Sequence, residues 1–245
     1  MRSFASIRFR PLTALSALRA LFRDPGDTAQ VFRIISALSG GARQRVLRRL
    51  RGTPVGRRVL AEGRSLAPLL LDRERLRALP EATLGRAYLQ FCERHGISAD
   101  GLIAASEDGD LDLDLTPDER VVRARMRDAH DLWHVVTGYQ TDLIGEASVL
   151  AFTLAQTGNP GVGLIVVSAF IDARGSGTAM RGSLIEAFRR GRSAAWLPAA
   201  DWEALLERPL AEVRRELCVG APPVYTPVWP EAVNPVKKPP RQRAA

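Results

Sequence analysis

The chain has 245 residues, a length that suits one large domain or two small ones. Its hydrophobic share of 46% and charged share of 25% are those of an ordinary folded protein and exclude a chain that is disordered throughout. The net charge of +8 favours a polyanionic partner, such as nucleic acid or an anionic membrane surface.

The first 23 residues contain five arginines and no acidic side chain. That composition is typical of a transit peptide or of an amphipathic helix lying on a membrane, although the segment could also simply begin the folded domain. We expect residues 1–11 to be flexible or membrane-proximal. Leucines at positions 12, 15, 18 and 21 predict a helix over 11–22 with one apolar stripe.

A second predicted helix begins at Asp27 or Thr28 and runs to Leu38, where Gly40-Gly41 would end it. A basic stretch follows, with a short helix over 44–50 and only Glu62 to balance its charge. Its arginines are Arg43, Arg45, Arg48, Arg49, Arg51, Arg57, Arg58 and Arg64. Because guanidinium groups match phosphate geometry, this stretch either faces anionic headgroups or is a solvated surface with no ligand.

The next elements are another helix and an acidic segment. Leu79-Pro80 predicts a helix start, and the apolar pattern runs on to Arg94 and ends at Gly96. Residues 106–117 alternate aspartates with small or apolar side chains. We expect an exposed acidic loop there, because the glycine and glutamate that a calcium-binding loop needs are missing.

Residues that start or end helices recur between positions 116 and 171. Thr116-Pro117-Asp118-Glu119 predicts the start of a helix that reaches about Val136 and ends near Gly138. A further helix should run from about Thr141 to Gln156. The β-branched segment 162–171 suits a strand or a buried helix, and its helical neighbours favour the helix.

Helices over 179–190 and 201–217 should complete the domain before a proline-rich basic tail, residues 222–245, that is extended or disordered. No apolar run approaches the roughly 20 residues that span a bilayer. The sequence thus predicts a mainly α, single-domain helical bundle over residues 12–221.

A candidate metal site lies in this bundle. His130 and His134 are four residues apart and share one face of a helix, and Asp131 follows the first of them. Imidazole nitrogen and carboxylate oxygen suit zinc, iron(II) or manganese. Most such histidine pairs are structural or exposed. The residues alone therefore leave open whether this pair binds a metal ion or has no ligand.

Glu146 can join these side chains only if the chain reverses. On an unbroken helix it would lie roughly 20 Å or more along the axis, at about 1.5 Å per residue. Gly138 supplies a break, and Thr141 or Asp142 can cap the helix that follows. The predicted metal site therefore lies between two helices.

The segment His130-Asp131-Leu132-Trp133-His134, followed by eleven residues and then Glu146, matches the H-D-x-x-H…E signature of the ubiquinone (coenzyme Q) biosynthesis protein four family. Residues 27–32, 79–88 and 209–214 also look similar to that family. The resemblance covers roughly residues 12–228.

The resemblance implies a mostly helical fold with a zinc-type site whose ligands are His130, Asp131, His134 and Glu146. Because zinc has no redox chemistry, Fe²⁺ or Mn²⁺ remain alternatives to Zn²⁺. The resemblance also implies an oligomer that contacts other ubiquinone biosynthesis proteins. That oligomer would be peripheral on the inner membrane, on the cytoplasmic side in a bacterium or the matrix side in a mitochondrion.

The activity that the resemblance implies is removal of the ring C1 carboxyl group from a polyprenylated 4-hydroxybenzoate, in a simple or an oxidative version. The chain would then be a metal-dependent lyase. The alternative is a non-catalytic scaffold that organises the biosynthetic complex and presents isoprenoid lipid intermediates. Nucleic acid is not an expected partner, because the basic stretch has no zinc-finger spacing and no interleaved aromatic side chains.

Other side chains near the motif have two interpretations each. Arg127 could steady a substrate carboxylate or pair with Asp131, and Tyr139 could donate a proton or be a packed aromatic. Apolar residues of the following segments could line an isoprenoid tunnel or be ordinary core. They are Leu143, Ile144, Val149, Leu150, Phe152 and the segment 162–171.

Overall fold

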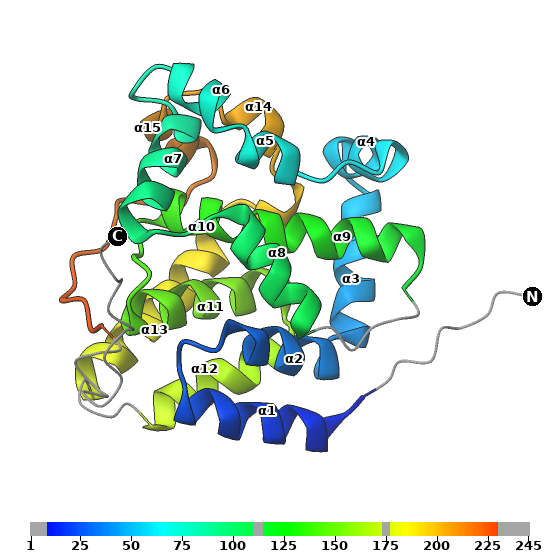
Figure 1. Cartoon of the computed structure of the whole chain (residues 1–245), viewed down its shortest axis with the longest axis vertical. Helices are drawn as coiled ribbons and strands as arrows, with labels where there is room; N and C mark the ends of the chain where they lie inside the picture. Colours follow the sequence, from blue (N-terminus) through cyan, green and yellow to red (C-terminus); the bar gives the residue numbers. More distant parts are fainter. Residues whose placement is uncertain (1–8, 110–114, 173–176, 230–245) are drawn as a thin grey trace, which may run out of the picture.

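The computed structural model describes residues 9–109, 115–172 and 177–229, and the regular structure within these ranges is helical (Figure 1). A single antiparallel bridge between Thr83 and Pro209 is the one β pairing that they contain. The predicted mainly α, single-domain fold is confirmed.

The helices follow one another with short connections. The first part of the chain forms α1 (Pro11–Arg23), α2 (Thr28–Leu38), α3 (Gly40–Arg51), α4 (Pro54–Glu62), α5 (Ala67–Leu71), α6 (Arg73–Ala78), α7 (Leu84–His95) and α8 (Ala99–Asp108). The second part forms α9 (Pro117–Asp128), α10 (His130–Thr137), α11 (Leu143–Thr157), α12 (Pro160–Asp172), α13 (Gly177–Ser193), a 3₁₀ turn (Leu197–Ala199), α14 (Trp202–Leu205) and α15 (Leu210–Glu216).

Helices α10, α11 and α13 lie in the middle of the molecule (Figure 1). Helices α1, α2 and α12 lie along one side of them, and α5, α6, α14 and α15 lie at the opposite end. The core includes Trp133 and Phe152, whose rings meet edge to face with centroids 6.0 Å apart. Helices α11 and α13 approach closely at Gly191, where a Cβ atom would lie 2.7 Å from the Phe152 carbonyl oxygen.

Only the second half of the predicted leucine stripe of α1, Leu18 and Leu21, packs against the core. Ala14, Ala17 and Leu18 are buried against α2, whereas Leu12 is 81% exposed and Leu15 is 42% exposed. The small alanine side chains let α2 approach closely, and the leucine stripe is therefore only partly a core stripe. This leaves large apolar side chains on the outer face of α1.

Two predicted helix ends are shifted. Gly40-Gly41 does not end α2 but begins α3, because the chain turns at Ser39, whose hydroxyl donates to Ile35 and accepts from Asn159. Helix α7 begins four residues after Pro80. The Thr83 hydroxyl donates to the Pro80 carbonyl and accepts the Arg86 N–H, and so caps the helix. Polar side chains, rather than glycine or proline, set both boundaries.

Two long predicted helices are each divided in two. The first is interrupted at Ala129, between α9 and α10. The second, over 201–217, is divided into α14 and α15. The carbonyl groups of Leu206 and Arg208 accept the Gly85 and Leu84 N–H groups at the start of α7 and so do not continue a helix.

Two further segments differ from expectation. The acidic segment is helical up to Asp108, which ends α8, and its residues 110–114 lie outside the described ranges. Segment 162–171 is a helix, as predicted, but only one side of it is buried. Val162 is 2% exposed, whereas Val167 and Ile171 are 54% and 70% exposed.

The basic stretch is not a free cationic surface, because most of its arginines bind other parts of the protein. Arg43 pairs with Glu119, Arg51 with Asp118, Arg58 with Asp201 and Arg64 with Glu62. Arg45 donates to the Gly158 carbonyl, and Arg49 stacks on Trp196 at 4.3 Å. Apart from the local pair of Arg64 and Glu62, these contacts tie α3 and α4 to the rest of the bundle.

The described ends of the chain are attached to the domain. The Arg10 N–H donates to the Ala37 carbonyl at 2.9 Å, and the first eight residues of the tail, 222–229, have no regular secondary structure and contact the start of α11. Within the described ranges, no helix combines the length and hydropathy that crossing a bilayer requires.

Candidate metal centre

Two helices present the candidate ligands. His130 and His134 lie one turn apart on α10, which ends at Gly138 with a left-handed φ of 83°. The chain then reverses, and Asp142 caps α11 by accepting the Ile144 N–H at 3.0 Å. Glu146 lies in the first turn of α11 and faces the imidazoles. The predicted chain reversal and the Asp142 cap are confirmed.

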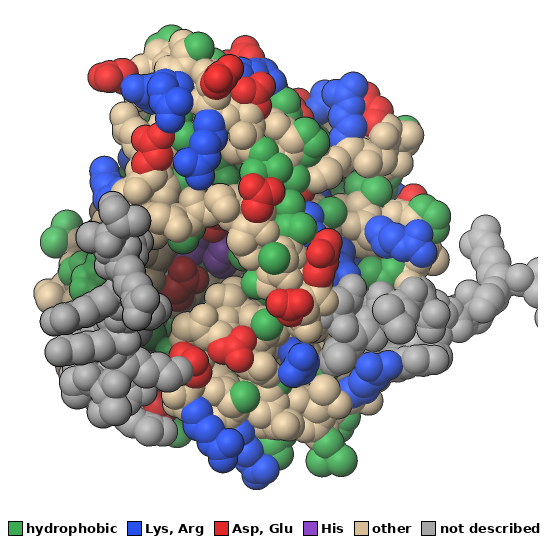
Figure 2. All heavy atoms as spheres, viewed as in Figure 1, with side chains coloured by type: hydrophobic (Ala, Val, Ile, Leu, Met, Phe, Trp, Pro, Cys, Tyr) green, Lys and Arg blue, Asp and Glu red, His purple; other side chains and the backbone are tan. Residues whose placement is uncertain are grey.

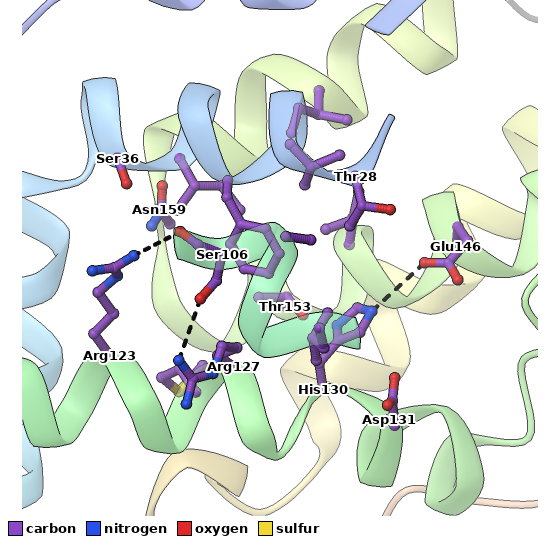
Figure 3. Close-up of a pocket in the computed structure, with 18 of the residues that line it drawn as sticks. Thr28, Ser36, Ser106, Arg123, Arg127, His130, Asp131, Glu146, Thr153 and Asn159 are labelled. Atoms are coloured by element: carbon purple, nitrogen blue, oxygen red, sulfur yellow. Dashed lines mark hydrogen bonds and ion pairs between the residues drawn. The ribbon is translucent and has the colours of Figure 1, made fainter. Parts of the chain in front are cut away.

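Three donor atoms converge at this place. The Nε2 atoms of His130 and His134 are 3.2 Å apart, and a Glu146 carboxylate oxygen lies 3.6 Å and 3.5 Å from them. In Figure 3, His130 and Glu146 point toward one another across the gap between α10 and α11. Within the described residues, these three form the group whose ligand atoms all lie within 4.8 Å of one another.

The His134 ring is held so that Nε2 faces the group. Its Nδ1 lies 3.2 Å from the Tyr139 carbonyl oxygen, which can only accept, so Nδ1 carries the proton and Nε2 has a free lone pair. Phe91 stacks on the same ring, with centroids 5.6 Å apart. A backbone carbonyl on the second nitrogen of an imidazole is the usual support of a metal-binding histidine.

The carboxylate and the imidazoles perturb one another. Burial acts to raise the pKa of Glu146, but the neighbouring His134 and His130 rings outweigh it and hold that pKa well below its ordinary value. Burial likewise acts to lower the pKa of His134, but the Glu146 and Asp131 carboxylates and the Tyr139 carbonyl together outweigh it and raise that pKa. Negative charge is therefore stable at Glu146, and positive charge is favoured beside it.

Asp131 lies next to this group but outside it. Its carboxylate is buried, at 7% exposure, and burial raises its pKa. No described residue donates a hydrogen bond or forms an ion pair with it, and it contributes to the wall of the cavity on which His130 and Glu146 also lie. Because a buried carboxylate without a partner is costly, its surroundings suit a cation.

The donor geometry fits a small divalent ion. A tetrahedral ion with ligands at about 2.0–2.1 Å places those ligands about 3.4 Å apart. The three donor separations of 3.2, 3.5 and 3.6 Å are close to that value. Of the four predicted ligands, the structure brings His130, His134 and Glu146 together and leaves Asp131 beside them as a buried carboxyl group.

A cavity of about 740 Å³ opens beside the three donors. A histidine and an acidic side chain are visible at the bottom of a hollow in the surface (Figure 2). Most of the wall is apolar and comes from α2, α8, α9 and α11. It includes Val31, Phe32, Ile35, Leu102, Met126, Leu143 and Leu150.

The predicted tunnel residues are only partly in this wall. Leu143 and Leu150 line the cavity, as does Ile165 of α12, whereas Ile144 and Phe152 are ordinary core. The contributions of α2 and α8 were missed, because nothing local in the sequence shows that residues more than twenty positions away cover the site.

The remaining candidates have structural contacts. The Arg127 guanidinium lies 2.7–2.8 Å from Asp128, not Asp131, although Arg127 does reach the cavity wall (Figure 3). The Tyr139 ring is buried under Arg190, and its hydroxyl has no hydrogen-bond partner. Of the two interpretations, Tyr139 is a packed aromatic side chain rather than a proton donor. Only its backbone carbonyl contacts the site.

Sequence reasoning also missed the third histidine of the chain. His95, in the last turn of α7, bonds to the Thr141 hydroxyl at 2.9 Å, and its ring lies 4.7 Å from Phe91. Phe91 in turn stacks on His134. This aromatic row supports the turn between α10 and α11, and no spacing in the sequence indicates it.

Relatives with known names are similar to most of the chain. The mitochondrial ubiquinone biosynthesis protein COQ4 of Meyerozyma guilliermondii is 30% identical over 182 residues, which are 74% of this chain and 56% of that protein. The mitochondrial COQ4 homolog of Bos taurus is 32% identical over 219 residues, which are 87% of this chain and 78% of that protein. The chain thus spans a little over half the length of the first of these relatives.

The fold also has a solved counterpart. The crystal structure of a protein from Nostoc punctiforme, described as a ubiquinone biosynthesis protein, has a TM-score of 0.67 and 23% identity and covers 87% of this chain and all of that one. At that identity the likeness establishes the fold. Since residues 6–223 match the family described as coenzyme Q (ubiquinone) biosynthesis protein Coq4, the chain belongs to that family.

Proposed function

We propose that the chain binds one divalent metal ion through His130, His134 and Glu146. With this ion it would remove the C1 carboxyl group of a polyprenylated 4-hydroxybenzoate in ubiquinone biosynthesis. The convergence of two imidazoles and a carboxylate at the wall of a deep apolar cavity carries this proposal. Family membership supports the pathway, and the geometry supports the metal.

The charges of the site suit this assignment. Glu146 and Asp131 together supply two negative charges, which would balance a divalent ion in a partly buried place. Zn²⁺ fits the ligand types best, and Fe²⁺ or Mn²⁺ suit the same set. An ion held there would supply Lewis-acid stabilisation of negative charge on a bound carboxylate or phenolate.

The cavity supports a substrate with a polar head and an apolar chain. The aromatic head would lie at the histidine end, and the apolar walls from α2, α8 and α11 would hold the isoprenoid chain and exclude water. In the simple reaction, carbon dioxide leaves C1 and a proton from solvent replaces it. The oxidative version leaves a hydroxyl group instead and requires an external oxidant such as dioxygen.

Metal removal tests the catalytic proposal. We expect the purified protein to contain about one metal ion per chain, to lose decarboxylation on a polyprenylated hydroxybenzoate after chelation, and to recover it when the same ion is added back. Full activity of the demetallated protein would contradict a catalytic metal. Recovery with Fe²⁺ or Mn²⁺ but not Zn²⁺, together with a hydroxylated product, would indicate the oxidative version.

A scaffold role is the second candidate, and the exposed apolar side chains favour it. Leu12 on α1 and Val167 and Ile171 on α12 are more than half exposed, and both helices lie on the same side of the molecule (Figure 1). Such side chains suit a second copy of the chain, other ubiquinone biosynthesis proteins or a membrane surface. The two candidates are compatible, since Leu12, Val167 and Ile171 do not line the cavity.

We propose that this apolar side attaches the protein peripherally to the inner membrane, with the arginines of α1 near anionic headgroups. We expect Leu12→Asp with Ile171→Asp to weaken binding to anionic lipid vesicles at least about tenfold, since each buried leucine or isoleucine contributes about 1.5–3 kcal/mol. Val224→Asp, at a fully exposed position outside α1 and α12, is the matched control. Equal vesicle binding of the double variant and the control would contradict this attachment.

A further inference from the structure

The cap of the helix that carries Glu146 is a fully buried carboxylate. Asp142 is 0% exposed, and its oxygens accept the Ile144 N–H at 3.0 Å, the Val228 N–H at 2.9 Å and the Tyr225 hydroxyl at 2.7 Å. Two of these three donors come from more than eighty residues away in the chain. An ordinary helix cap needs only the bond from the Ile144 N–H.

The distant donors belong to residues 219–229, which we call the C-terminal strap. Besides bonding to Asp142, the strap accepts the Leu143 N–H at the Val228 carbonyl and the Gln140 N–H at the Tyr225 hydroxyl, at 2.8 and 2.9 Å. It thus satisfies the first N–H group of α11, which has no partner within the helix, and one N–H group of the turn before it. The turn between the two liganding helices is bound along most of its length.

The strap is also packed tightly against this turn. A Cβ atom at Gly138 would lie 2.6 Å from Pro222, and one at Gly145 would lie 2.7 Å from the Tyr225 hydroxyl. Arg190 of α13 donates to the carbonyl groups of Thr137, Val219 and Ala221, and so joins the end of α10 to the beginning of the strap. The position of the strap is therefore defined by contacts with both liganding helices.

We infer that the C-terminal strap sets the position of Glu146 and that Tyr225 is a positioning residue of the metal centre, an inference that rests on the proposed metal function. The Glu146 N–H bonds to the Asp142 carbonyl at 2.8 Å, so Glu146 lies in the turn that the cap starts. Without the strap, the Gln140 and Leu143 N–H groups lose their partners and Asp142 keeps only the Ile144 N–H, so the first turn of α11 is free to fray. Tyr225 does not line the cavity and acts through Asp142.

The test compares two tyrosines that lie side by side. Tyr225→Phe removes the hydroxyl that bonds to Asp142 and Gln140. Tyr139→Phe is the matched control. It leaves the backbone carbonyl that contacts His134 unchanged and removes only a hydroxyl without a hydrogen-bond partner, and its ring centroid is 6.0 Å from that of Tyr225. We would measure the affinity of each full-length protein for Zn²⁺ and Co²⁺, the visible spectrum of the Co²⁺ form, and the thermal midpoint of the metal-free form.

We expect Tyr225→Phe to bind both ions about tenfold more weakly, as for loss of an outer support of a metal ligand, and to show an altered Co²⁺ spectrum. Tyr139→Phe should match the wild type in both. Ser148→Ala removes a buried hydroxyl bond to Ser183 farther along α11. It shows whether a loss of stability alone weakens metal binding.

Wild-type affinity and spectrum in Tyr225→Phe would overturn the role of the strap, whatever its thermal midpoint. An equal loss of affinity in Ser148→Ala would overturn it as well, since stability rather than position would then explain the effect. Absence of Zn²⁺ and Co²⁺ binding in the wild type is a different result. It would overturn the proposed metal function and this inference with it.

Discussion

Replacing Glu146 by glutamine should abolish decarboxylation and weaken metal binding by at least about 100-fold. Loss of an outer support costs roughly 10–100-fold in affinity, and this change removes a ligand charge itself. The glutamine has the same shape but cannot supply the negative charge that lies 3.5–3.6 Å from both imidazole nitrogens. Metal titration and an assay on a polyprenylated hydroxybenzoate measure the two effects.

Asp131→Asn is the graded comparison for this variant. Its carboxylate lies beside the three donors rather than among them, so we expect a smaller loss of metal affinity, about tenfold. If both variants remain folded and retain full activity, the catalytic proposal fails. If Glu146→Gln loses activity while association with other ubiquinone biosynthesis proteins is preserved, the scaffold function is separable from catalysis.

Gly145→Ala should be the most destabilising small substitution near the site. A Cβ atom there would lie 2.0 Å from the Gln140 carbonyl oxygen, a backbone atom that cannot move aside without disturbing the turn. Forcing an extra carbon into such a place costs about 3 kcal/mol or more. For a domain of this size, that lowers the melting temperature by roughly 6–12 °C, which calorimetry would detect.

Gly182→Ala is the matched control for that change. Gly182 lies inside α13, and no atom would come within 4 Å of an added Cβ. Alanine should there raise the free energy of unfolding by about 0.5–1 kcal/mol, because glycine is a poor helix former. If Gly145→Ala did not lower the melting temperature either, the inference that the turn is tightly packed against the strap would be wrong.

The sequence predicted the chain reversal because its signals are local. Gly138 has the left-handed backbone that few other residues adopt, and Asp142 caps the next helix through its own side chain. Thr116 likewise caps α9 where the sequence predicted a helix start, and the structure adds a reciprocal bond from Glu119. Each of these features depends on residues within a few positions of one another.

The interruption between α9 and α10 could not be predicted in the same way. Ala129 has an ordinary right-handed backbone with φ −77° and ψ −8°, and alanine is the best helix former. The interruption of the helix at Ala129 is a consequence of how α9 and α10 pack against other helices. The outward direction of Leu12 has the same origin, since it depends on how closely α2 approaches α1.

The surroundings of the site depend on long-range contacts. The cavity wall from α2 and α8, the support of His134 by Phe91, and the bonds from Tyr225 and Val228 to Asp142 join segments tens of residues apart. Single-residue patterns carry no information on such pairs. The candidate ligand residues could therefore be chosen from the sequence, whereas the cavity beside them could not.

The most direct test of the metal centre is anomalous diffraction from crystals of the full-length protein at the absorption edge of the ion that it contains. We predict one ion per chain, about 2.0–2.3 Å from Nε2 of His130, Nε2 of His134 and a carboxylate oxygen of Glu146. An ion bound elsewhere, or these three side chains in place with no anomalous signal between them after metal loading, would contradict the account.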